Sequence, residues 1–297
     1  MKPLISVVGT TASGKSGLGI ALARHFGGEV VSADSRQIYT GFDLGTGKVT
    51  EEETEGIPHH LLDIREAGER FSMGEFQALA YDAIDDIHSR GKIPFLVGGT
   101  GLYARAVTAG YTLSDTPPDE AFRLEMADKS WEELASMLAE CGVTVTDRQI
   151  SPLRLVRMLE KCRAGNPAEN ESNPRYRVLQ LGLTWEREYL NSLIETRLDR
   201  RIEEGMIDEV RRLLENGASE EFMEALGLEY RYTTRYILGK YESFEAYREQ
   251  FLTEIKRFAK RQQTWFKKDQ DIVWLNVGGD YIAEAIALCE AFLSEQA

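Results

Sequence analysis

The chain has 297 residues, of which 42% are hydrophobic, so it can bury one large core or two unequal ones. Its formal net charge of -14 excludes a protein coated with cations for general nucleic-acid binding. The sequence has no apolar run close to the roughly 18 residues that predict a membrane span, and no CxxC pair that would indicate a zinc site. We therefore expect a cytoplasmic protein that does not enter the membrane, and as a separate expectation we take it to be a monomer.

The first third of the chain alternates predicted strands with predicted helices. The strands are expected at residues 4–9, 29–35 and 93–99, and the helices at residues 15–25 and 72–90. This alternation indicates a parallel sheet, in which ligands bind beyond the carboxyl ends of the strands. Polar and glycine-rich motifs follow all three predicted strands, at those ends.

The middle of the chain has a different pattern. Segments rich in Pro, Gly, Asn and Asp at residues 114–120 and 164–175 bracket a stretch, residues 120–165, that predicts helices. Further strands are expected at residues 178–183 and 273–277, with long helices between them.

This order predicts the α/β class with two domains. The parallel-sheet core is expected to consist of residues 1–112 and 176–297, and residues 113–175 are expected to form a mainly helical insertion.

The turn after the first strand, GTTASGKS, fits the phosphate-loop pattern GxxxxGK[ST] at every position, between a strand and a helix. In such a loop, backbone N–H groups and the helix N-terminus attract an anion, Lys15 adds a full charge, and the hydroxyl of Ser16 can bind Mg²⁺. We therefore predict a P-loop diphosphate site with Mg²⁺ as cofactor, formed by Gly9, Thr10, Thr11, Ala12, Ser13, Gly14, Lys15 and Ser16. The loop alone does not identify its ligand, and a nucleoside triphosphate is the commonest one.

Further motifs, read in order, resemble those of the tRNA dimethylallyltransferase (tRNA isopentenyltransferase) family of the bacterial type. They are SADSRQIY (32–39), GFDLGTGK (41–48), PHHLLDI (58–64), FLVGGTGLY (95–103), IETRLDRRIEEGMIDEV (194–210) and KRQQTWF (260–266). No single motif would establish the resemblance, but the series extends over most of the chain.

The resemblance implies transfer of a dimethylallyl group from dimethylallyl diphosphate to N6 of adenine 37 in the tRNA anticodon loop, with release of pyrophosphate. It places Asp34, Thr100 and Arg197 at the reaction centre. A carboxylate suits the amine that loses a proton, and cations suit the departing pyrophosphate. The resemblance also makes the insertion a tRNA-binding domain and implies tRNA contacts by Asp34, Ser35, Arg36, Gln37, Thr100, Arg154 and Arg157.

The residues taken alone leave alternatives open. Arg197 fits a surface ion pair, the hydroxyl of Thr100 fits a turn-stabilising group, and Arg154 and Arg157 fit solvated positions on a helix. The basic and aromatic stretch at residues 256–269 fits an amphipathic helix that buries its aromatic side chains.

One segment departs from the family pattern. The family usually shows Gly-Tyr followed by a basic residue where this chain has ALGLEYR, residues 225–231. The glycine aligns and its neighbours differ, so residue roles in this segment do not carry over.

Three other classes of protein share part of the pattern. An adenylate isopentenyltransferase shares the loop and Asp34, but a free nucleotide needs neither the insertion nor the basic segment. A P-loop kinase shares only the first motif. A non-catalytic RNA-binding relative would have no use for the intact motifs.

Overall fold

The structure is a computed structural model that describes residues 1–113, 116–165 and 172–295. It divides into two compact units. The larger unit consists of Met1–Thr108 and Pro174–Ala297, and the smaller unit of Ala109–Asn173. No helix in the described part of the chain is long and apolar enough to cross a membrane.

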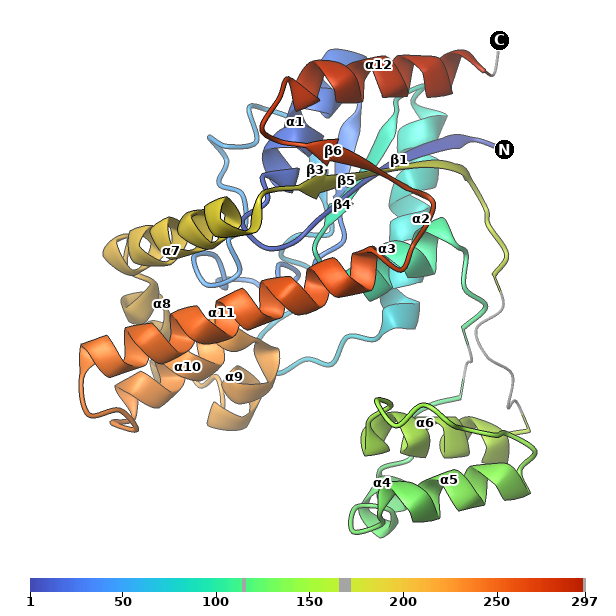
Figure 1. The fold of residues 1–297 in the computed structure, drawn as a ribbon, viewed down its shortest axis with the longest axis vertical. Coiled ribbons are helices and arrows are strands. Elements are labelled where there is room, and N and C mark those ends of the chain that lie inside the picture. The colour runs from blue at the N-terminus through green and yellow to red at the C-terminus, as the bar shows by residue number, and fades with distance from the viewer. Residues whose placement is uncertain (114–115, 166–171, 296–297) are drawn as a thin grey trace. The chain divides into compact units, whose positions relative to one another are not determined.

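A parallel six-stranded sheet forms the middle of the larger unit (Figure 1). Its order is β3-β2-β4-β1-β5-β6, which confirms the predicted α/β class. Five strands lie where the sequence predicts them, and the two-residue β3 is too short to show a pattern. The strands are β1 (Pro3–Val8), β2 (Glu29–Ser32), β3 (His59–His60), β4 (Pro94–Gly98), β5 (Arg177–Thr184) and β6 (Ile272–Asn276).

Helices cover both faces of this sheet (Figure 1). Successive residues of β1 point to opposite faces, so Leu4 and Val8 join one core and Ile5 and Val7 join the other. Because both faces are buried, the strands appear in the sequence as continuous apolar runs. The first core lies under α2 (Met73–Ser89) and α3 (Gly101–Thr108), and the second under α1 (Lys15–Phe26) and α12 (Tyr281–Ser294).

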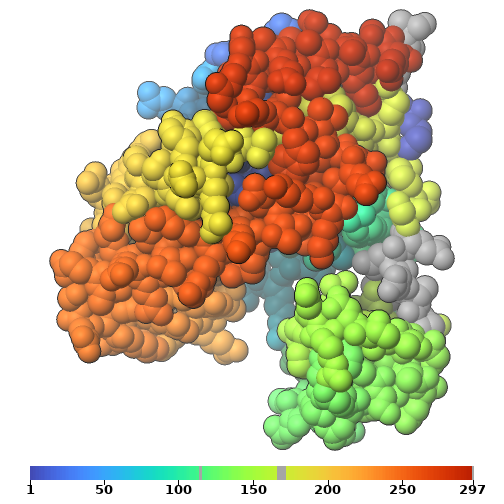
Figure 2. Space-filling view, in the orientation of Figure 1, coloured from blue at the N-terminus to red at the C-terminus, as the bar shows by residue number. Residues whose placement is uncertain are grey.

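Five further helices of the larger unit pack around cores of their own, which include Leu198, Tyr230, Tyr247 and Phe251. Figure 2 shows two of them, α7 and α11, side by side, and α11 also contacts α3 beside the sheet. These helices are α7 (Arg187–Glu203), α8 (Met206–Glu215), α9 (Glu220–Leu226), α10 (Leu228–Ile237) and α11 (Phe244–Phe266).

The smaller unit contains α4 (Glu120–Glu125), α5 (Trp131–Glu140) and α6 (Pro152–Arg163). Leucines at helical spacing on α5 and α6, among them Leu134, Leu138, Leu155 and Leu159, form its core. The helices begin where the sequence supplies N-caps, at Asp119, Ser130 and Ser151. The two predicted breaker segments lie partly outside the described residues.

Candidate active site

The loop at residues 9–16 connects β1 to α1 and has unusual backbone geometry. Ala12 (φ 59°) and Gly14 (φ 90°) are left-handed, and Gly14 is the N-cap of α1. A Cβ at Gly9 would lie 2.7 Å from the Oγ of Ser13, so the loop turns tightly there. Left-handed residues directly before a helix turn backbone N–H groups toward one concave side, which suits an anion. The loop therefore has the form of a polyphosphate cradle.

Lys15, the first residue of α1, supplies the full positive charge of this cradle. Its Nζ donates a hydrogen bond to the carbonyl oxygen of Thr10 at 3.3 Å. Burial and the nearby charge of Arg197 lower the pKa of Lys15 to about 8, and the carboxylate of Asp34 opposes this shift. An anionic ligand would restore the preference of this amine for its charged form.

Two arginines on successive turns of α7, Arg197 and Arg201, lie close to Lys15. Burial and the charge of Arg201 lower the pKa of Arg197, and burial lowers the pKa of Arg201. The Nη2 atom of Arg201 is buried and has no hydrogen-bond partner among the described residues. The surrounding cluster has four cations and two carboxylates, an excess of positive charge that favours a polyanion. Its members are Lys15, Arg36, Arg197, Arg201, Asp34 and Glu229.

The segment at residues 41–48 closes over these arginines. Gly47 has φ 64°, and a Cβ there would collide with guanidinium nitrogens of both Arg197 and Arg201. Glu209 on α8 fixes the segment, because its carboxylate accepts from three successive backbone N–H groups, residues 43–45, at 2.7 to 3.2 Å. The GFDLGTGK motif thus provides close backbone approach to the cation cluster.

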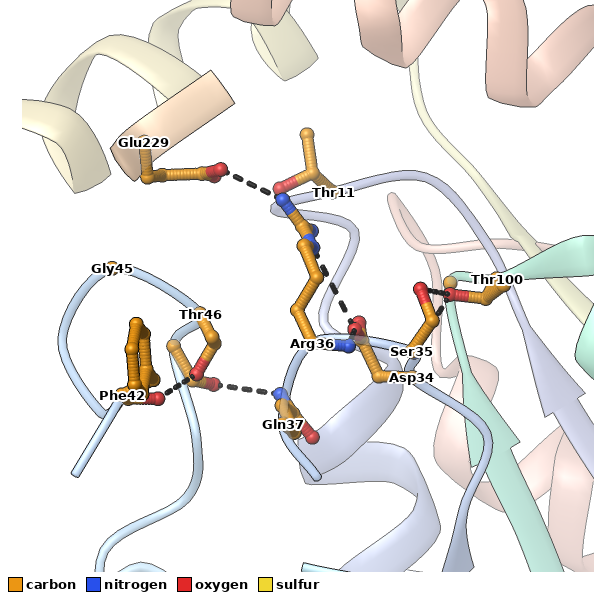
Figure 3. Close-up of polar contacts among 12 residues, drawn as sticks. Thr11, Asp34, Ser35, Arg36, Gln37, Phe42, Gly45, Thr46, Thr100 and Glu229 are labelled. Carbon is orange, nitrogen blue, oxygen red and sulfur yellow. Dashed lines mark hydrogen bonds and ion pairs between the residues drawn. The ribbon is translucent and has the colours of Figure 1, made fainter. Parts of the chain in front are cut away.

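Asp34 and Thr100 come together because β2 and β4 are neighbours in the sheet. The Oγ1 of Thr100 accepts a hydrogen bond from the backbone N–H of Ser35 at 3.1 Å (Figure 3). Asp34 is buried, with 7% of the whole residue exposed, and its carboxylate accepts from the backbone N–H of Arg36 at 3.0 Å. The threonine therefore stabilises the turn that presents Asp34.

A cavity of about 500 Å³ opens in front of this turn. Asp34, Arg36 and Thr100 line one part of it, and Phe258 and Trp265 of α11 line another. A cavity with flat apolar walls and a few polar groups suits a heterocyclic base.

Gln262 on α11 connects this cavity to the phosphate loop. Its Oε1 accepts from the backbone N–H of Thr11 at 2.9 Å, and its Nε2 donates to the carbonyl oxygen of Gly99 at 3.0 Å. One side chain therefore joins the loop after β1, the turn after β4 and helix α11.

Two predicted base-reading residues are already engaged within the protein. The Nη1 of Arg36 lies 2.7 Å from the carboxylate of Glu229. The amide of Gln37 accepts from the Oγ of Ser32 at 3.2 Å and donates to the carbonyl oxygen of Gly47 at 3.1 Å. Gln37 therefore holds the 41–48 segment, and its contact with tRNA stays a prediction.

The other predicted tRNA contacts lie on α6 in the smaller unit. The guanidinium of Arg157 bonds to Glu160 at 2.7 Å and to the carbonyl oxygen of Thr116 at 2.6 Å, so it supports the core of this unit. Arg154 is exposed. Only Arg154 fits the solvated arginine that the helix pattern alone suggests, and tRNA contact by either arginine stays a prediction.

The sequence did not single out four residues of the site: Arg201, Glu209, Glu229 and Gln262. Arg201 lies four residues after Arg197, so helical spacing could have placed both on one face. The other three act through contacts between distant segments, which leave no local signal.

Together these features define an α/β protein with a loop suited to a polyphosphate beside a cavity suited to an aromatic group, the arrangement of a group-transfer enzyme. Its closer relationships follow from sequence. The sequence model of the IPP transferase family matches residues 37–269, and the chain belongs to this family.

Relatives and solved structures agree over nearly the whole chain. It is 42% identical to tRNA dimethylallyltransferase 2 of Shewanella sediminis, over 95% of this chain and 96% of the relative. It is 40% identical to tRNA dimethylallyltransferase of Anoxybacillus flavithermus, over 95% of this chain and 92% of the relative. The full-length tRNA isopentenylpyrophosphate transferase of Bacillus halodurans is 34% identical, with TM-score 0.77 over 99% of this chain and 98% of that one. A eukaryotic dimethylallyltransferase acting on tRNA is 26% identical, with TM-score 0.82 over 99% of this chain and 80% of that one.

Proposed function

We propose that this chain transfers a dimethylallyl group from dimethylallyl diphosphate to N6 of adenine 37 in the tRNA anticodon loop and releases pyrophosphate. Relatives that match almost end to end are named for the transfer of a dimethylallyl group to tRNA, and the donor and the target atom are those that the motif resemblance implies. We further propose that it works in the cytoplasm as a monomer.

One structural observation carries the chemistry. A cluster with four cations lies directly beside the Asp34–Thr100 wall of a base-sized cavity. The first feature suits a leaving diphosphate and the second suits an amine that must lose a proton. The carboxylate of Asp34 is close enough to Lys15 to raise the pKa of that amine, so the leaving diphosphate and the amine of the substrate would meet at this point.

In the proposed reaction, the N6 nitrogen forms a bond to the allylic carbon of the donor. The bond from this carbon to the diphosphate oxygen breaks, and its electron pair leaves with pyrophosphate. The alkylated nitrogen then loses a proton, which Asp34 accepts. Lys15 and Arg197 offset the charge that develops on the leaving group.

Mg²⁺ is part of this proposal. The described residues contain no group of three or more His, Cys, Asp or Glu side chains that could hold a metal ion. This fits Mg²⁺, which binds through few protein ligands and the oxygens of substrate phosphates. Ser16, on the first turn of α1, would provide the protein hydroxyl, and bound Mg²⁺ would neutralise charge on the diphosphate.

The tRNA substrate requires a base outside its stack. An adenine in an anticodon loop must be extruded before its exocyclic nitrogen can be reached, and aromatic side chains then hold the ring. Phe258 and Trp265 provide such faces. The exposed cations Lys260 and Arg261 on the same helix suit the nearby phosphates, and we propose that the smaller unit adds contacts through Arg154.

The proposal is tested by incubating the purified chain with dimethylallyl diphosphate, Mg²⁺ and an unmodified tRNA that has adenine at position 37. We expect isopentenyladenosine in the digested tRNA, with one pyrophosphate released per modified base. Alkylated AMP with unmodified tRNA would favour the adenylate isopentenyltransferase. Release of ADP from ATP, with a phosphorylated product, would favour a kinase.

A further inference from the structure

The Arg36 side chain is held between two carboxylates that belong to different parts of the fold. Its Nη1 lies 2.7 Å from Oε2 of Glu229, and its Nε lies 3.7 Å from Oδ1 of Asp34 (Figure 3). All three side chains are largely buried: their exposed fractions are 16% for Arg36, 10% for Asp34 and 8% for Glu229. The closer partner is therefore Glu229.

The start of α10 shapes the slot that holds Arg36. A Cβ at Gly227 would lie 2.9 Å from the Cδ of Arg36, so the absence of a side chain there makes room for the arginine. The ring of Phe258 lies 5.9 Å from its guanidinium carbon. Glu229 follows on the first turn of α10, and its other oxygen lies 3.8 Å from Nη1 of Arg201. These contacts fix both the path and the end of the Arg36 side chain.

Competition between the carboxylates gives Glu229 a chemical role. If it did not bind the guanidinium, Asp34 would be the nearest remaining carboxylate, and the pair between them would tighten. A carboxylate in a close ion pair with arginine is a weaker proton acceptor, because the cation favours its ionised form. A close pair would also occupy an oxygen that must face the amine of the substrate.

We propose that Glu229 is a positioning residue for the transfer reaction: by holding the guanidinium of Arg36, it keeps the carboxylate of Asp34 available to the N6 amine. The inference rests on the proposed function. It also gives a role to a residue of segment 225–231, where this sequence departs from the family pattern.

The test is a comparison of Glu229→Gln with the full-length wild type. Single-turnover rates with saturating tRNA report the chemical step, and the dissociation constant of dimethylallyl thiodiphosphate reports the donor site. We expect the rate of Glu229→Gln to fall at least about 10-fold, since general-base assistance is worth about 10² to 10⁴ in rate. Donor-analogue affinity should stay equal or become tighter, because the variant adds net positive charge to the cluster.

The matched control is Glu224→Gln on α9. Glu224 also binds an arginine, with both oxygens 2.6 Å from Arg235, but the arginines that it contacts are Arg231 and Arg235 and not Arg36. Its rate and donor affinity should equal those of the wild type.

A double-mutant cycle shows whether Glu229 acts through Arg36. In an Arg36→Met background, Glu229→Gln should change the rate by less than about twofold, because the guanidinium that it restrains is gone. This comparison also covers the case in which Glu229→Gln alone fails to fold, since removal of both members of a buried pair is often tolerated.

Three results would overturn the inference: a wild-type rate in folded Glu229→Gln, an equal rate loss in the Arg36→Met background, or loss of donor affinity parallel to the rate. Failure of the proposed function would look different, because the wild type itself would then produce no isopentenyladenosine.

Discussion

The depressed pKa of Lys15 predicts that donor binding takes up a proton. Without a ligand, Lys15 has a pKa of about 8 because burial and Arg197 disfavour its charge. A bound diphosphate adds several negative charges next to the amine, so in the complex the pKa of Lys15 should return at least to its ordinary value of 10.5. Above pH 7 the donor itself is nearly fully ionised, since phosphate monoesters lose their last proton near a pKa of about 6.

The size of the effect follows from this pKa. The deprotonated fraction of the unliganded Lys15 amine is about 0.1 at pH 7, about 0.5 at pH 8 and about 0.9 at pH 9. Binding of one donor should therefore take up about the same number of protons at each pH. The sign is that affinity falls as pH rises, because an amine that has lost its charge must first be protonated. Between pH 7 and pH 9 the dissociation constant should therefore increase by about 10-fold.

The assay is calorimetric titration with dimethylallyl thiodiphosphate in buffers of different ionisation enthalpy. The slope of measured heat against that enthalpy gives the number of protons taken up at each pH. Lys15→Met is the control and should bind more weakly, with no uptake from this site. If Lys15→Met showed the same uptake as the wild type, or if the wild type showed none at pH 9, the assignment of this titration to Lys15 would be wrong.

Three substitutions test other parts of the site. Asp34→Asn should slow the single-turnover rate by about 10² to 10⁴, with donor and tRNA affinities nearly unchanged. If donor affinity instead collapsed and excess Mg²⁺ restored it, Asp34 would be a partner of the metal. Gly47→Ala should weaken donor-analogue binding by at least about 10-fold, because its Cβ meets Arg197 and Arg201; Gly56→Ala, also left-handed but with open space around it, should bind normally. Gln262→Leu should weaken donor binding by about 10-fold through loss of two hydrogen bonds, while the control Gln263→Leu should bind the donor normally. Equal donor affinities of Gln262→Leu and the wild type in a fluorescence titration would show that the bridge does not support the loop.

The sequence could predict the parts of the fold that depend on short segments. The phosphate loop and five strands carry local signals, since glycine spacing and apolar runs reflect backbone geometry and burial on both faces. The joining of Asp34 and Thr100 also follows, because both come after parallel strands whose carboxyl ends meet at one edge. The confirmed α/β class is built from these local features.

The remaining parts of the site depend on long-range contacts. The residue pattern alone favoured a surface ion pair for Arg197, but the structure gives this arginine no ion pair within the described residues and sets it among other cations. The ion pair of Glu229 with Arg36 joins segments 193 residues apart. Only packing of α7, α10 and α11 against the strands creates these pairs, so no window of sequence contains them.

The bridge made by Gln262 has a consequence for synthesis of the chain. The phosphate loop is among the first segments to leave the ribosome. The side chain of Gln262, which accepts from the N–H of Thr11, is synthesised 251 residues after that threonine and 163 residues after Gly99, its other partner. A nascent chain that ends before α11 therefore has the cradle without its restraint. Donor affinity should rise by about 10-fold once Gln262 has emerged and bridged the loop, so a stalled chain should hold a prenyl diphosphate more weakly than the finished protein.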